Sequence, residues 1–185
     1  MNILTETQKA YADEYEGAWI TTYTGKQFHF LKPTPDEVDI RDIAHHLSLL
    51  CRFTGACRWF YSVADHSICV ADLVPQELKL SALLHDAAEA YINDISRPVK
   101  YSHKLDSTEA AIMSVIADKF GINPTAPEIK EADNILIATE ARDLMANTNC
   151  WALLPKPLSA RIRPLDSRTA EIKFLFRFQL YGGKE

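Results

Sequence analysis

His85, Asp86 and Glu89 are set into a stretch, Leu78 to Ile92, that is apolar almost all the way round. Apolar residues on nearly every side predict a buried helix, in which an isolated charge costs several kcal/mol unless it finds a partner. A divalent metal ion satisfies an adjacent histidine and aspartate together, and side chains three or four residues apart share one neighbourhood on a helix. A buried ion pair with an arginine from elsewhere in the chain is the alternative, and the pattern alone does not decide between the two.

Two further polar residues stand in apolar helical patterns. His66 follows Ser62, a suitable N-cap, and Asp133 lies in the apolar stripe of a later predicted helix. Together with His85 and Asp86 they come from three helices, and helical bundles commonly build metal sites from side chains on facing helices. Two imidazoles and two carboxylates suit Mn, Fe, Co, Ni or Zn, and suit Mg less well.

The spacing of apolar residues is helical along most of the chain, and no internal repeat or low-complexity tract divides it. We therefore predict an all-α helical bundle, with a single domain over residues 17–185 preceded by an arm over residues 1–16. Two short β-prone runs, Trp19–Tyr23 and Gln27–Leu31, indicate a small N-terminal β-hairpin.

The predicted helices are bounded by turn residues. Pro75 opens the central helix and Gly55 ends the first one. The last helix has a second interpretation, because Phe174, Phe176 and Phe178 also alternate as in a strand. The predicted helices cover residues 40–55, 62–73, 78–92, 105–119, 128–146 and 167–181, with a loop over residues 93–100 and an irregular stretch over residues 147–166.

The composition restricts the classes of function. The formal charge of −5 gives no general attraction for polymeric nucleic acid or for an anionic membrane, so an anionic ligand would need a local basic pocket. No apolar run approaches the length that spans a bilayer, and the N-terminus lacks a signal-sequence pattern. The 4 cysteines form no C-x-x-C pair, which predicts reduced packing residues in a cytoplasmic protein.

Over roughly residues 20 to 145 the chain resembles the HD-domain metal-dependent phosphohydrolases, whose pattern is His…His-Asp…Asp. Within that family it is similar to the YfbR/YfdR-like deoxynucleotidase group, which includes phage dATP triphosphohydrolases. The resemblance depends on spaced blocks in the same order: residues 42–44, 51–55, 60–67, 84–90, 93–95, 98–101, 132–134 and 139–144.

The resemblance implies a role for each matching residue. Glu89 acts with a metal-bound water as general base or proton shuttle, and Asp94 corresponds to a second catalytic acid. Arg52 matches an arginine that contacts the sugar-phosphate, and Arg97 and Lys100 are candidates for further phosphate contacts. The metal ligands implied are His66, His85, Asp86 and Asp133.

The aromatic residues near position 60 have two interpretations. Trp59 and Tyr61 either belong to the core or form a wall for the base or sugar of a substrate, where shape sets specificity. His45 and His46 are interpreted as helix-face or supporting residues rather than ligands. Glu140 is open between support for Asp133 and an ion pair with Arg142.

The function implied is hydrolysis of deoxynucleotides, with dATP triphosphohydrolase favoured over a 5'-deoxynucleotidase that cleaves dNMPs. The native metal (Co, Mn, Zn or Mg) and the base preference stay open. A non-catalytic nucleotide-binding regulator is the alternative from another class, and a pure binder has no need of Glu89. Hydrolysis of cyclic or signalling nucleotides is a further alternative. The resemblance also implies a homo-oligomer, a dimer or hexamer, in the bacterial or phage-infected host cytosol.

Overall fold

The structure is a computed structural model that describes residues 19–147, 151 and 154–184. Within these residues it consists of helices and one short antiparallel hairpin, which confirms the predicted all-α fold with a small N-terminal β-hairpin. The predicted arm, residues 1–16, lies outside the described residues. The elements are β1 (Ile20–Thr21), β2 (Gln27–Phe28), α2 (Ile40–Leu49), α3 (Val63–Leu73), α4 (Lys79–Leu83), α5 (Glu89–Ile92), α6 (Arg97–His103), α7 (Asp106–Phe120), α8 (Pro127–Leu144) and α9 (Ser167–Leu180), with 3-10 helices at Arg52–Gly55 and Gln76–Leu78.

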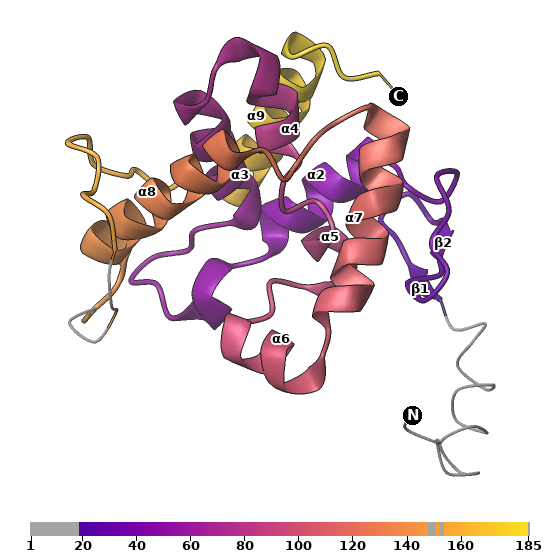
Figure 1. Cartoon of the computed structure of the whole chain (residues 1–185), viewed down its shortest axis with the longest axis horizontal. Coiled ribbons are helices and arrows are strands. Elements are labelled where there is room, and N and C mark those ends of the chain that lie inside the picture. Colours follow the sequence, from indigo (N-terminus) through magenta and orange to yellow (C-terminus); the bar gives the residue numbers. More distant parts are fainter. Residues whose placement is uncertain (1–18, 148–150, 152–153, 185) are drawn as a thin grey trace.

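Helix α3 is at the centre of the packing and contacts α2, α4, α8 and α9. Figure 1 shows α8 on one side of it, and α7 with the hairpin on the other. Two side chains set helix starts: the Ser62 hydroxyl accepts the N–H of Asp65 at the start of α3, and Asp39 accepts the N–H of Arg41 at the start of α2. The predicted N-cap at Ser62 is confirmed. No helix of the described residues is long and apolar enough to cross a membrane.

The hairpin is shorter than predicted and is attached to α2. Ile20 pairs with Phe28 and Thr21 with Gln27. The buried Asp42 carboxylate accepts the backbone N–H of Thr24 at 2.6 Å and its hydroxyl at 2.9 Å. This pair of hydrogen bonds fixes the turn of the hairpin on the helix.

The single helix predicted over residues 78–92 is wrong, because the structure breaks it at the His85-Asp86 pair. Helix α4 ends at Leu83 and α5 begins at Glu89. Between them the backbone N–H groups of His85, Ala87 and Glu89 donate to the carbonyl three residues back, as in tighter turns. The His85 ring also bonds to the Ala82 carbonyl, which competes with regular helical bonding.

The first helix also ends earlier than predicted. Helix α2 stops at Leu49, and the chain becomes extended so that Arg52 donates its N–H to the carbonyl of Tyr61. The following 3-10 segment contains Phe53 at φ 54° and Thr54 at φ 56°, a left-handed conformation that continues to Gly55 at φ 79°. A continuous helix would have left no chain to pair with residues 61–62.

Residues 93–100 and 167–180 also differ from, or decide between, the predicted structures. The predicted loop over residues 93–100 contains the start of α6, with Pro98 in its first turn, where a proline costs no hydrogen bond. Residues 167–180 are helical, so the strand interpretation is wrong. Ala170, Phe174 and Phe178 are four apart on the buried face of α9, and this spacing was the informative one.

Candidate metal centre

Three side chains from separate elements converge beside α3. His66 from α3, His85 from the turn after α4, and Asp133 from α8 each offer one ligand atom, and these atoms lie within 4.8 Å of one another. His66 Nε2 is 3.2 Å from the Asp133 carboxylate. The group could hold a metal ion.

The two imidazoles are arranged as metal ligands are. His85 donates its Nδ1 proton to the Ala82 carbonyl at 2.8 Å, and His66 donates its Nδ1 proton to the Glu140 carboxylate at 2.7 Å. Both Nε2 atoms are buried and make no hydrogen bond. A neutral imidazole that donates through Nδ1 presents its lone pair at Nε2, so two lone pairs meet beside a carboxylate. This donor set fits a divalent metal.

Asp86, predicted as a fourth ligand, lies at the edge of the cluster. Its Oδ2 is 3.2 Å from His85 Nε2 and 3.6 Å from His66 Nε2. The same oxygen is 3.7 Å from the Arg52 guanidinium. Asp86 therefore adjoins both the ligand group and a buried cation.

Glu140 contacts two residues of the site that the sequence did not indicate as its partners. Its side chain is fully buried and accepts from His66 Nδ1 and, at 3.2 Å, from Arg52 Nη2. Burial raises its pKa, but Arg52 and His66 outweigh burial and lower it. Arg142, the partner considered from the sequence, pairs with Asp143 instead. The only signal in the sequence was a glutamate within an apolar stripe.

The electrostatics of the cluster favour the positively charged form of His66 and the negatively charged form of Asp133. Burial and the Arg52 guanidinium act to lower the pKa of His66, but the Glu140 and Asp133 carboxylates outweigh them and raise it to about 9. Burial acts to raise the pKa of Asp133, but His66 outweighs it and lowers that pKa to about 2. In this carboxylate-rich setting a cation at Nε2 is stabilised.

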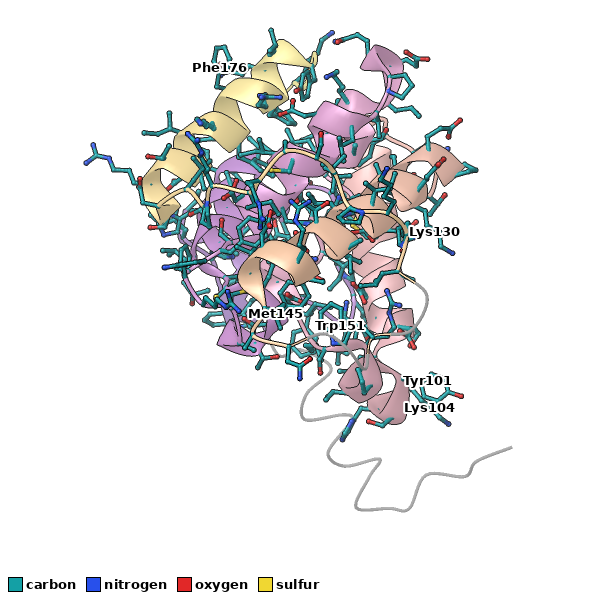
Figure 2. All side chains as sticks on the ribbon, turned by 90° about the vertical axis from the view of Figure 1, so that its left-hand side faces the viewer. Tyr101, Lys104, Lys130, Met145, Trp151 and Phe176 are labelled. Carbon is teal, nitrogen blue, oxygen red and sulfur yellow. The ribbon has the colours of Figure 1, made fainter. Side chains whose placement is uncertain are left out.

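A pocket of about 570 Å³ adjoins the cluster between α6, α8 and the Arg52–Gly55 segment. Figure 2 shows Trp151 on the α6 side of α8, where it contributes to this pocket. Most of the predicted site residues line it: Arg52, Asp86, Glu89, Asp94, Arg97, Lys100 and Asp133.

Glu89 is the most unusual carboxylate of the pocket. It is 4 % exposed, and its Oε2 is buried without a hydrogen bond. Its Oε1 lies 3.3 Å from Lys100 Nζ, which also contacts Glu109 at 2.7 Å. Burial and the nearby carboxylates of Asp86 and Asp94 raise the pKa of Glu89 well above its usual range. A carboxyl group of this kind is more basic than an ordinary glutamate, as a proton-transfer residue requires.

The structure does not bring Trp59 or Tyr61 to this pocket. Trp59 is 60 % exposed beside Phe60 and residues 162–167, and Tyr61 is fully buried. The aromatic residues that line the pocket are Phe53 and Trp151, with ring centroids 5.7 Å apart. Phe53 lies in one of the blocks that carry the family resemblance but was not predicted as a site residue, and Trp151 lies in the stretch predicted as irregular, where no periodic pattern marked it.

His45 and His46 lie away from the cluster, on α2. His45 stacks on Tyr23 with ring centroids 3.7 Å apart and contacts Glu171. His46 donates Nδ1–H to the Ala90 carbonyl at 2.7 Å and accepts the Tyr23 N–H at 3.1 Å. His45 thus connects the hairpin to α9, and His46 connects it to α5.

The fold and the cluster together define the class: an all-helical protein with two histidines and an aspartate arranged to hold a metal ion beside an open pocket. A scan against profiles of known protein families finds no match.

Comparison with curated proteins identifies the family. The chain is 40% identical over 167 residues to the uncharacterised protein YfdR of Escherichia coli K12, an alignment that covers 87% of this chain and 94% of YfdR. It is 30% identical over 172 residues to an uncharacterised protein of Rhodobacter capsulatus, which covers 80% of this chain and 88% of that protein. This chain belongs to the same family as YfdR.

Proposed function

We propose that this protein is a metal-dependent phosphohydrolase of deoxynucleotides, and that its reaction is hydrolysis of dATP to deoxyadenosine and inorganic triphosphate. One observation carries the proposal: two buried imidazole nitrogens without hydrogen bonds converge with Asp133 beside a pocket whose lining includes Arg52, Arg97 and Lys100. These three cations could bind the negatively charged oxygens of a phosphate ester. The resemblance to the HD-domain phosphohydrolases supports the same reaction and favours dATP.

The residues that would hold the metal are His66, His85 and Asp133, with Asp86 beside them. A bound divalent ion supplies Lewis-acid polarisation of a phosphoryl oxygen and a water of lowered pKa. Nitrogen and oxygen donors in this mixture favour Mn, Co or Zn over Mg, and the identity of the ion belongs to the test.

The cations of the chain bind and orient the phosphate. Arg52 is held by Glu140 and lies near Asp86, so its planar donor group is fixed at the pocket wall. Lys100, between Glu89 and Glu109, supplies a point charge, and Arg97 lines the outer part of the pocket. A bound phosphate would compete with Glu89 and Glu109 for the Lys100 ammonium.

Glu89 is the residue we assign to proton transfer. Its raised pKa and its unpartnered Oε2 allow it to take a proton from the attacking water, and Asp94 at the pocket wall is the second acid, available to the leaving sugar oxygen. The new bond joins the water oxygen to phosphorus, and the bond from the sugar oxygen to phosphorus breaks. Phe53 and Trp151 offer aromatic faces for the base.

The test is a product assay on metal-free protein resupplied with Co, Mn, Zn or Mg. Each dNTP and dNMP is the substrate in turn, and nucleoside, phosphate, pyrophosphate and triphosphate are quantified. We expect deoxyadenosine and triphosphate from dATP, with little product from dAMP or from other dNTPs. Nucleoside and phosphate from several dNMPs, with dNTPs intact, would contradict the triphosphate assignment and identify a 5'-deoxynucleotidase.

A Glu89→Gln variant separates catalysis from binding. We expect it to bind metal and nucleotide as the wild type does but to lose turnover by roughly 10²- to 10⁴-fold, since positioned acid–base groups contribute that much. Wild-type protein that binds nucleotide without hydrolysing any would be a regulator, the alternative from another class. Turnover of Glu89→Gln at the normal rate would remove Glu89 from the mechanism.

We further propose that the protein acts as a homo-oligomer in the cytosol. Deoxynucleotides are cytosolic metabolites, and the cysteines of the described residues, Cys51, Cys57 and Cys69, are free thiols. The oligomeric state is supported by the family resemblance alone, and a light-scattering mass of the purified protein measures it.

A further inference from the structure

A second cavity, of about 800 Å³, adjoins the first along α8. The two cavities share three lining residues, Arg97, Ile137 and Leu154. Of the three residues that could hold a metal, Asp133 lines the first cavity, and none lines the second. The second cavity therefore extends the space beside the cluster in one direction, along the part of α8 that carries Lys130 (Figure 2).

The lining of the second cavity is positively charged. Arg97, Lys130 and Lys156 face a single carboxylate, that of Glu131. Across residues 19–147, 151 and 154–184, the structure shows no ion pair of these three cations. In a chain with a formal charge of −5, this is a local exception that attracts a polyanion.

Helix α8 fixes the distance between the two cavities. Lys130 and Asn134, four residues apart, line only the second cavity, whereas Asp133 lines only the first and Ile137, four residues after it, lines both. Lys130 and Asp133 are separated by about 5 Å along the helix axis at the ordinary rise per residue. A ligand with one phosphate at the cluster could therefore reach Lys130 with a further phosphate of the same chain.

We propose that the second cavity binds the phosphates of a nucleoside polyphosphate beyond the one that reacts, with Lys130 and Lys156 as the binding cations and Arg97 at the boundary. This inference depends on the proposed function, because it specifies how the same site distinguishes a triphosphate from a monophosphate. A monophosphate reacting at the cluster leaves the second cavity without an anion, so it forgoes these contacts.

The test uses the double variant Lys130→Gln/Lys156→Gln and a matched control, Lys173→Gln/Lys184→Gln. Both pairs remove two exposed positive charges, one from a long helix and one from an irregular segment, and the control residues line neither cavity. Titration calorimetry measures the affinity of the metal-free proteins for dATP and for dAMP, so no turnover interferes. The KM for dATP of the metal-loaded proteins is measured in parallel.

We expect wild-type protein to bind dATP more tightly than dAMP and the double variant to lose most of that preference. The loss of charge-assisted contacts should weaken dATP binding by at least about tenfold, with dAMP binding unchanged. The KM for dATP should rise by a similar factor with little change in kcat, because these contacts exist before and during the reaction. The control variant should match the wild type throughout.

Several results would overturn the inference without touching the proposed hydrolase function. These are equal binding of dATP and dAMP by the wild type, unchanged dATP affinity in the double variant, or an equal loss in the control. Inorganic triphosphate that binds alongside dATP rather than in competition with it would indicate a separate effector site and would also overturn it. A failure of every nucleotide to be hydrolysed contradicts the proposed function instead, and the calorimetric comparison still decides the role of the cavity.

Discussion

At the scale of single residues, Glu140 controls two members of the site at once. It accepts the Nδ1 proton of His66, which directs the Nε2 lone pair to the cluster, and it holds the Arg52 guanidinium at the pocket wall. Partners of metal-bound histidines of this kind set both the ring orientation and the basicity of the ligand. The charge of Glu140 is thus as much part of the centre as the ligands.

A Glu140→Gln variant keeps the shape of the side chain but removes the charge. We expect its affinity for Co or Mn to fall by about 10- to 100-fold, the usual effect of losing such a partner. Calorimetry on metal-free protein measures the affinity, and Glu128→Gln, an exposed change on the same helix, is the control. Equal metal affinity in Glu140→Gln and wild type would show that His66 does not depend on this carboxylate.

The individual site residues were easier to predict than their contacts. His66, His85, Asp86 and Asp133 attracted attention because charged and imidazole groups are rare in apolar helical patterns, and the structure gathers them. The pairing of Glu140 with His66 depends on how α8 crosses α3, which no local pattern encodes.

At the scale of elements, helix α9 has apolar side chains on two faces, but only one of these faces packs against the core. Phe174 is fully buried against a core built by α2, α3 and α4, whereas Phe176, two residues later, is 60 % exposed. This double character explains why the sequence of α9 also resembled a strand. Burial on one side of a helix, every fourth residue, resolves the ambiguity.

The two phenylalanines form a matched pair for measuring that packing. Phe174→Ala should lower the free energy of unfolding by about 3–5 kcal/mol, because it deletes a large buried side chain. Phe176→Ala should change it by no more than about 0.5 kcal/mol, as exposed substitutions do. Urea denaturation measures both, and similar losses for the two variants would mean that α9 uses a different face.

The end of α8 is tied to the segment that follows it by Asp143. Its carboxylate accepts from Arg142 and Arg161 at 2.7 Å and from the backbone N–H of Ile162 at 3.0 Å. The hydrogen bonds from Arg142 lower the pKa of Asp143 most, and burial opposes them in part. A carboxyl group with a lower pKa in the folded state stabilises the fold above its unfolded pKa, and loses that contribution as pH falls through the folded value.

Asp143→Asn should therefore be less stable than wild type at pH 7, by about 1–2 kcal/mol for the weakened charged hydrogen bonds. The difference should shrink progressively below about pH 4, where the wild-type carboxylate begins to be protonated in the unfolded chain. Urea unfolding at pH 7, 4 and 2.5 follows this trend, with the exposed Asp118→Asn as control. A stability difference that stays constant from pH 7 to 2.5 would contradict the role of the charge.

The elements themselves were predicted well where apolar spacing persisted and poorly where polar groups turned the chain. The helices around residues 63–73, 106–120, 127–144 and 167–180 follow their patterns. The break at His85 escaped prediction because the apolar pattern stays helical across it, and the bond of the His85 ring to Ala82 leaves no mark in that pattern. The early end of α2 escaped it because Arg52 pairs with Tyr61 through the backbone, which carries no side-chain signature.

At the scale of the whole molecule, the cluster of His66, His85 and Asp133 exists only in the folded chain. Its members come from α3, from the turn after α4 and from α8, so unfolding separates them. A ligand that binds the native state alone stabilises it according to its concentration and dissociation constant. Metal binding would therefore indicate that the chain is correctly folded.

Adding a binding metal should raise the unfolding free energy by about 2.7 kcal/mol when its free concentration is one hundred times its dissociation constant. Thermal unfolding with and without chelator measures this, and Asp133→Asn should show little or no metal-dependent shift. An unchanged unfolding temperature for wild-type protein across all four candidate metals would argue that the cluster is a set of paired charges and not a metal centre.

The left-handed segment at Phe53, Thr54 and Gly55 has an evolutionary consequence. Non-glycine residues in this conformation cost on the order of 1–3 kcal/mol each, and two occur in succession beside Arg52. Selection for stability alone would replace Thr54 with glycine or straighten the segment. If the segment is kept because it places Phe53 and Arg52 at the pocket, related sequences should diverge most slowly here and fastest on the exposed face of α9.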